Sequence, residues 1–276
     1  MAQRGGSARP PLTDARRILI LAPHPDDETV ACGIAARRAR TEGARIAVLY
    51  LTTGVPLPEI LWSWQRPRYT KLVARRRAEA LAAAALLDIE PVGFLDIASR
   101  RLSVQLDDAL AAVERAAVQS AAGQLWVPAF EGAHQDHDAA NALAARFRGR
   151  LAVWEFAAYN KAGGRARSNR FADARGGVIE LRLRREEMAL KRRVLRLYAS
   201  QRINLAHIGL AEEAYRPLPR HDYAQPPHPG PLFRERFQWV PLRHPRIDFT
   251  RSAEIYRTLG RWSAGGGLDT AAAADG

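Results

Sequence analysis

Hydrophobic residues along the chain fall into short continuous runs that alternate with longer segments of helical spacing. Continuous apolar runs of this length are typical of strands that are buried on both faces of a sheet. From Pro25 the spacing becomes helical, because proline and acidic residues suit a helix N-terminus and Gly43 suits a helix end. The pattern predicts strands over 16–23, 44–54, 91–97, the first part of 123–138, and 150–156. It predicts helices over 25–43, 66–89, 105–121 and 139–147.

Strands that alternate with helices form βαβ units, which build a mostly parallel sheet with helices on both faces. The sequence therefore predicts an α/β fold of three layers, with ligands bound beyond the carboxyl ends of the strands. A nucleotide site of the Rossmann type is not expected, because the first strand-to-helix turn lacks the G-x-G-x-x-G pattern.

One domain is expected to span residues 15–250. Residues 1–14 are rich in glycine, proline and arginine, so we expect a flexible lead-in there, and we expect a disordered tail over 263–276. A long loop is expected over 161–177, followed by a strand and a helix. Residues 203–250 are rich in proline and histidine, so we expect an irregular segment that wraps the site or a sheet edge.

The chain of 276 residues has a formal net charge of +13, and its basic residues are almost all arginine. This charge fits either an anionic partner or a coding bias toward arginine, and no pattern of specific nucleic-acid recognition accompanies it. The single cysteine, Cys32, excludes an internal disulfide and a cysteine-cluster metal site. No apolar run approaches the ~18 residues of a membrane span. The N-terminus lacks the apolar core of a signal peptide, so a cytoplasmic location is expected.

The first polar cluster follows the first predicted strand, in the sequence APHPDDE over residues 22–28. His24 and Asp27 are three residues apart, so on a helix they lie on one face and can bind one divalent cation. Asp26 points about 100° away on a helix and can approach a water molecule without binding the metal. The alternative is an acidic first turn that only offsets the helix dipole.

The second cluster, HQDHD over residues 134–138, lies where the fourth strand meets the next helix. Its histidines, His134 and His137, are three residues apart, a spacing that permits them to bind one metal. The alternative is a polar loop in which Asp136 or Asp138 caps the next helix. Both clusters follow strands, so both are expected at the carboxyl edge of the sheet. Together they offer His, Asp and His ligands with a fourth position open for water, as catalytic zinc sites require. A spare carboxylate and a spare imidazole remain for proton transfer.

The pair of motifs resembles the PIG-L/LmbE family of metal-dependent N-deacetylases. APHPDDE is followed about a hundred residues later by EGAHQDHDAAN over 131–141, and the resemblance covers residues 16–156. It implies a Rossmann-like three-layer fold and, for many members, an N-acetylglucosaminyl conjugate as the substrate.

The resemblance also implies roles for single residues. It implies that one Zn²⁺ per chain, or Fe²⁺, binds to His24, Asp27 and His137. It makes Asp26 the general base, and His134 the residue that meets the oxyanion or acts as a general acid. Asp136 would orient a histidine, as carboxylates near metal sites commonly do.

Further residues are candidates for substrate contacts. Family members often carry Arg-x-x-Glu on the second helix, where Arg76 fits, and an aspartate after the third strand, where Asp96 fits. The alternatives are a solvated basic helix face and a capping aspartate. Trp62 and Trp64 would suit the apolar face of a sugar, core packing or an oligomer contact equally well. The end of the fifth strand would place Glu155, Tyr159 and Asn160 near the rim of the site, and the alternative is ordinary polarity at a strand end. The remaining histidines are interpreted as surface or loop residues: His207, His221, His228 and His244.

The leading hypothesis is a zinc-dependent hydrolase that removes the acetyl group from an N-acetylglucosamine-type amino sugar or its conjugate. An anionic conjugate would suit the basic charge. One alternative is a single-metal hydrolase of an ester or phosphoester, although phosphodiesterases often hold two metals and the ligands here support one. Another is a non-catalytic protein that binds carbohydrate or an anionic surface. The sequence leaves open the substrate, the native metal and the oligomeric state.

Overall fold

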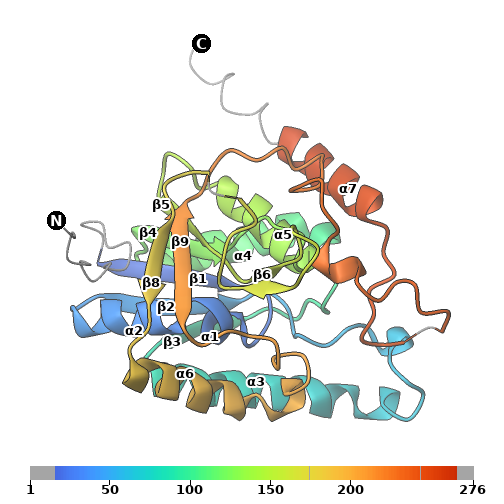
Figure 1. Cartoon of the computed structure of the whole chain (residues 1–276), viewed down its shortest axis with the longest axis horizontal. Coiled ribbons are helices and arrows are strands. Elements are labelled where there is room, and N and C mark those ends of the chain that lie inside the picture. The colour runs from blue at the N-terminus through green and yellow to red at the C-terminus, as the bar shows by residue number, and fades with distance from the viewer. Residues whose placement is uncertain (1–15, 174, 243, 266–276) are drawn as a thin grey trace.

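A computed structural model describes residues 16–173, 175–242 and 244–265 (Figure 1). The predicted lead-in, residues 1–14, and most of the predicted tail, residues 266–276, lie outside the described residues. The middle layer is a seven-stranded sheet of β1 (Arg17–Ala22), β2 (Arg45–Tyr50), β3 (Glu90–Phe94), β4 (Gln124–Pro128), β5 (Ala152–Phe156), β8 (Ile179–Arg182) and β9 (Glu212–Pro217). A separate small hairpin pairs β6 (Tyr159–Asn160) with β7 (Arg167–Ser168).

The strands of the sheet lie in the order β3-β2-β1-β4-β5-β9-β8. The pairings among the first five are parallel, and β9 and β8 are added in antiparallel fashion beside β5. The chain moves outward from β1 to β3 and then returns to place β4 on the other side of β1. This change of direction creates a switch point between β1 and β4, which is where α/β sheets bind their ligands.

Helices cover both faces of the sheet and confirm the predicted three-layer α/β fold. One face carries α1 (Asp27–Ala31), α2 (Gly33–Thr41), α3 (Tyr69–Leu87) and α6 (Arg185–Leu197). The other carries α4 (Leu106–Gln119), α5 (Gln135–Ala145) and α7 (Ser252–Gly265). Side chains alternate between the two faces of the sheet along β1. Leu19 and Leu21 therefore belong to the core on the α4 and α5 face, and Ile18 and Ile20 belong to the core on the opposite face. No described helix combines the length and apolar character that crossing a membrane requires.

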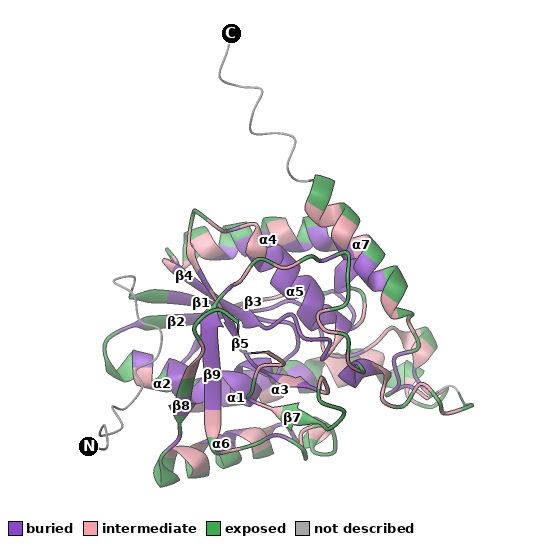
Figure 2. Ribbon diagram, turned by 45° about the horizontal axis from the view of Figure 1, so that its top comes forward, coloured by how far each residue is buried: buried purple, intermediate pink, exposed green. Residues whose placement is uncertain are grey.

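Buried residues are concentrated in the sheet and in α5 (Figure 2). Helix α5 begins at Gln135, four residues before the predicted start at 139, so the HQDHD motif forms its first turn. The helix predicted over 25–43 is divided at Cys32, whose φ of −140° is not helical. The motif residues therefore lie at two short helix starts that face the same edge of the sheet.

The irregular segment predicted over 203–250 contains strand β9, which the hydrophobic pattern did not reveal. Two of the strand's buried side chains are charged, Glu213 and Arg216. Glu213 accepts hydrogen bonds from the backbone at the start of α2 and pairs with the buried Lys191 at 3.1 Å. Buried charges are tolerated when they are paired, and this pairing is invisible in the local sequence. Beyond residue 250, α7 continues to Gly265 and includes the first three residues of the predicted tail.

Candidate active site

The two polar clusters meet at the switch point between β1 and β4. His24 follows the end of β1, and His134 and His137 lie at the start of α5, which follows β4. The ring centroids of His24 and His134 are 4.4 Å apart, and those of His24 and His137 are 5.4 Å apart. Pairing of β1 with β4 therefore brings together residues that are far apart in the sequence.

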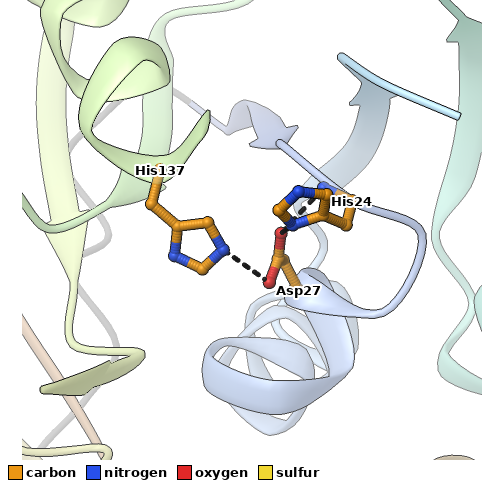
Figure 3. A group of neighbouring side chains, drawn as sticks. All are labelled: His24, Asp27 and His137. Atoms are coloured by element: carbon orange, nitrogen blue, oxygen red, sulfur yellow. Dashed lines mark hydrogen bonds and ion pairs between the residues drawn. The ribbon is translucent and has the colours of Figure 1, made fainter. Parts of the chain in front are cut away.

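His24, Asp27 and His137 form a compact group of potential metal ligands (Figure 3). Their ligand atoms all lie within 4.8 Å of one another, and all three residues are buried. Asp27 lies between the histidines, with Oδ2 at 3.1 Å from His24 Nδ1 and Oδ1 at 3.0 Å from His137 Nε2. Among the described residues, neither ring nitrogen of His137 has a partner with hydrogen-bond geometry. Because buried polar atoms normally find partners, this imidazole fits a bound cation.

Asp136 lies behind His24 and holds it in one orientation. The Asp136 carboxylate is 3.0 Å from His24 Nε2 and accepts the backbone N–H groups of Arg100 at 2.6 Å and Leu102 at 3.2 Å. A proton on Nε2 leaves His24 Nδ1 free to face Asp27. A second group with ligand spacing, His24, His134 and Asp136, is less suitable, because backbone donors already occupy the Asp136 oxygens. Burial raises the pKa of Asp136, but the His24 hydrogen bond and nearby charges bring it to about 2.

Opposite charges hold the His24–Asp27 pair ionised. Burial raises the pKa of Asp27, but His137 and His24 outweigh this effect and leave the pKa well below its usual range. Burial lowers the pKa of His24, but Asp27 and Asp136 together raise it to about 10. The carboxylate is therefore available as an anionic ligand, and a cation would compete with a proton for the His24 ring.

Asp26 stands beside the ligand group in a strained backbone conformation. Its φ of 155° and ψ of −19° are unusual for a residue with a side chain, and such strain is concentrated at functional sites. Its Oδ2 accepts a hydrogen bond from Arg76 Nη2 at 3.1 Å. A Cβ on Gly54 would lie 2.9 Å from two nitrogens of Arg76, so glycine there makes room for the guanidinium. Burial raises the pKa of Asp26, and Arg76 opposes that effect only in part.

His134 presents one ring nitrogen to the protein and the other to the cavity. It is the N-cap of α5, and its Nδ1 accepts the backbone N–H of Asp136 at 3.1 Å. A neutral ring in this arrangement carries its proton on Nε2 and is a hydrogen-bond donor there. Burial, followed by the charge on His24, holds the pKa of His134 well below its ordinary value.

A cavity of about 520 Å³ opens above these groups. Its lining includes His24, Asp26, Asp27 and His134, and the predicted contacts Trp62 and Arg76 also reach it. Tyr159, a candidate for the rim in the sequence, lines the cavity from β6. Several other lining residues were not predicted, because they lie on segments without a recognisable sequence pattern: Ser99, Arg100, Phe233, Arg236 and Asp248. His207 and His244, interpreted as surface or loop residues, also line the cavity.

Two candidate substrate contacts lie away from the cavity lining. Asp96 is exposed, because the loop after β3 brings Ser99 and Arg100 to the site instead. Trp64 is 66% exposed and stacks on Trp62, with ring centroids 5.2 Å apart and planes 8° from parallel. Trp62 is thus the aromatic residue of this loop that faces the cavity.

Glu155 is fully buried within the sheet and does not line the cavity. Its oxygens bind Arg216 Nε at 2.5 Å, Asn141 Nδ2 at 2.9 Å and His221 Nε2 at 3.1 Å. It therefore joins β5 to β9 and to the segment that follows. Glu155 therefore does not lie at the rim, because Arg216 on the neighbouring strand β9 and Asn141 hold its carboxylate inside the protein.

Replacing Glu155 with alanine is expected to lower the free energy of unfolding by about 3 kcal/mol, because buried Arg216 loses its closest carboxylate. Urea unfolding would measure the change, with Glu180→Ala on the exposed part of β8 as the matched control. A loss below about 1 kcal/mol, together with a raised KM, would instead show that Glu155 contacts substrate.

Comparisons with known proteins agree with this geometry. The family model described as PIG-L, GlcNAc-PI de-N-acetylase, matches residues 19–147, which include both polar clusters. Residues 19–147 belong to the PIG-L family. No curated protein matches the chain in sequence.

Solved structures resemble the chain over most of its length, well beyond the PIG-L segment. The A40926 pseudoaglycone deacetylase Dbv21 has a TM-score of 0.58 at 19% identity, covering 74% of this chain and 97% of its own. The zinc inhibited form of teicoplanin deacetylase Orf2 has a TM-score of 0.53 at 18% identity, with 73% and 97% covered. N,N'-diacetylchitobiose deacetylase from Pyrococcus horikoshii has a TM-score of 0.53 at 17% identity, with 76% and 86% covered. At these identities the likeness shows that the fold is shared.

Proposed function

We propose that this protein is a metal-dependent N-deacetylase that hydrolyses the acetamido group of an N-acetylglucosamine-type amino sugar or its conjugate. One observation carries the proposal. The ligand atoms of His24, Asp27 and His137 lie together beside a cavity, and the Asp26 carboxylate and the neutral His134 imidazole line that cavity with two of the ligands, His24 and Asp27. The family description, a de-N-acetylase, and the deacetylase neighbours support the same reaction.

His24, Asp27 and His137 would hold the cation, and the donor set of two imidazoles and one carboxylate suits zinc with an open position. Fe²⁺ accepts the same donor types. A cation there would supply Lewis acidity, polarising a carbonyl oxygen and making a water molecule more acidic. The three ligands support one cation per chain.

Asp26 is proposed to act as the general base. It lines the cavity, and Arg76 holds one of its oxygens in place. The water oxygen adds to the carbonyl carbon while Asp26 takes the released proton. Delivery of that proton to the amide nitrogen lets the C–N bond break and releases acetate and a primary amine.

His134 is proposed to stabilise the carbonyl oxygen as it gains negative charge. Its Nε2–H is the free donor of the ring, because Nδ1 is occupied by the backbone of α5. A fixed donor at this position costs no reorganisation during the reaction, which is the basis of oxyanion stabilisation. Asp136 is proposed to act indirectly, by keeping His24 in its ligand orientation.

The cavity lining supports an amino-sugar substrate with negative charge. Trp62 provides an aromatic face, and basic side chains outnumber acidic ones around it. These lining arginines are Arg75, Arg76, Arg100, Arg234, Arg236 and Arg246. The cytoplasmic location expected from the sequence stays a prediction.

Acetate and primary amine release from a panel of acetamido sugars would test this proposal. The panel contains N-acetylglucosamine, N,N'-diacetylchitobiose and N-acetylglucosamine 1-phosphate, with an aryl acetate and an aryl phosphate for comparison. We expect acetate and amine in equal amounts from at least one acetamido sugar. Phosphate release alone would favour the phosphoesterase alternative, and sugar binding without acetate release would favour the non-catalytic alternative.

A further inference from the structure

Three loops border the cavity and carry an unusual share of the exposed large hydrophobic side chains. These loops, residues 56–68, 199–208 and 233–250 without the undescribed residue 243, are called the rim here, and each contributes residues to the cavity lining. Nine large hydrophobic residues are exposed among the described residues, and six of them are on the rim. The six are Trp64, Ile203, Phe237, Trp239, Leu242 and Phe249.

Two of the rim loops are in direct contact, so their exposed side chains share one edge of the molecule. Trp62 packs edge-on against His244 with ring centroids 5.4 Å apart, and it stacks on Trp64. A second depression, of about 500 Å³, is lined by both loops and reaches Phe249. In Figure 1 the light-blue segment 56–68 and the orange segment 233–250 lie together at the right of the molecule.

The rim is basic as well as apolar, since each of its three loops contains more arginine than acidic residues. Arg236 lies over the rings of Phe233 at 3.8 Å and Phe237 at 4.8 Å. Arg246 is exposed and has no ion-pair partner among the described residues. The rim therefore combines exposed aromatic residues with one exposed cationic group, Arg246, that is available to negative charge.

This combination matches the interface of a lipid bilayer better than a polysaccharide. Tryptophan is enriched at the level of lipid headgroups, and arginine beside it is attracted to anionic lipids. Ile203 and Leu242 are aliphatic and offer no flat face to a sugar, but they can enter the acyl boundary. Large apolar side chains that are exposed beside a cavity favour an interaction site over a freely solvated surface.

We propose that the rim docks reversibly on an anionic lipid surface, with the mouth of the cavity facing the headgroups. Trp239, 77% exposed, and Leu242, 72% exposed, would enter the interface, while Arg246 and Arg236 would face the lipid charges. The proposal concerns binding in the absence of substrate, so it does not depend on the proposed deacetylase activity.

Sedimentation of the full chain with vesicles tests this proposal. One set of vesicles contains phosphatidylcholine alone, and the other contains phosphatidylcholine with phosphatidylglycerol. We expect binding to the anionic vesicles that weakens as salt is raised. The double variant Trp239→Ser/Leu242→Ser should lower the partition coefficient at least about tenfold, because two interfacial anchors are lost. Val118→Ser is the matched control, since Val118 is 81% exposed but lies on α4, away from the rim.

Three results would overturn the proposal. The first is that the wild-type chain does not sediment with the anionic vesicles, and the second is that Val118→Ser weakens binding as much as the rim variant. The third is a dimer, seen by light scattering, that the rim variant dissociates, because the rim would then pair with a second copy of the chain. Acetate release from a soluble acetamido sugar is measured on the same rim variant, since neither residue lines the cavity. Loss of vesicle binding with retained acetate release would support the docking role.

Discussion

Replacing Asp26 with alanine is expected to reduce kcat by about 10²–10⁴-fold while the metal stays bound. Asp26 lines the cavity beside His24 and Asp27, but it is not among the three residues whose ligand atoms converge. Its carboxylate is held by Arg76, and its backbone is strained, with a φ of 155°. Removal of this side chain should therefore take away the proton acceptor and leave the ligand group intact.

Acetate release and metal content, measured on the same Asp26→Ala sample, would check this expectation. Asp108→Ala is the matched control, because Asp108 is an exposed carboxylate on α4, far from the cavity lining. If Asp26→Ala loses the metal as well as its activity, Asp26 is a metal ligand and not the general base.

Replacing His137 with alanine is expected to remove the metal itself. The side chain is fully buried, and its Nε2 faces Asp27 without a hydrogen bond of its own among the described residues. Loss of a residue that hydrogen-bonds to a metal ligand lowers metal affinity by about 10–100-fold. Loss of the ligand His137 itself should lower metal affinity further. Asp136→Ala, which removes such a residue behind His24, should lie within that 10–100-fold range.

Metal per chain after dialysis and zinc affinity by titration would measure both effects. His228→Ala is a matched control, since His228 binds a backbone carbonyl and does not line the cavity. His137→Asn, which keeps a polar side chain at the start of α5, is the second variant if alanine unfolds the helix. Full metal retention in a folded His137 variant would exclude His137 from the ligand set.

Much of this site was predictable from local patterns and one topological rule. Each polar cluster directly follows an apolar run, and parallel strands deliver their carboxyl ends to one edge. That reasoning was enough to expect His24 and His137 together. Their meeting also depends on β1 pairing with β4, and the alternation of strands and helices does not specify that strand order.

The contacts that hold the site residues in place were less predictable, because backbone atoms provide them. Asp136 is anchored by the N–H groups of Arg100 and Leu102, in a loop where Arg100 adopts a positive φ of 71°. No side-chain pattern in the sequence indicates that turn. The same loop turns Asp96 to solvent, although its position after β3 suggested a substrate contact.

Buried charge was the main cause of the remaining errors. Strand β9 carries Glu213 and Arg216, whose partners come from α6 and β5, so hydrophobic periodicity does not reveal the strand. Glu155 was placed at the rim for the same reason, since a carboxylate near a strand end is expected to face solvent. Long-range pairing reverses that expectation, and it appears only when the whole sheet is assembled.

A zinc titration of metal-stripped protein, followed by acetate release, tests whether one cation bound by His24, Asp27 and His137 is required for the reaction. The substrate is the acetamido sugar that the panel identifies, and metal content is measured at each point. We expect no acetate without metal, and a rise in acetate release with added zinc that is complete at one equivalent per chain. Acetate release that does not depend on metal, or that requires two equivalents, would contradict a deacetylase built on His24, Asp27 and His137.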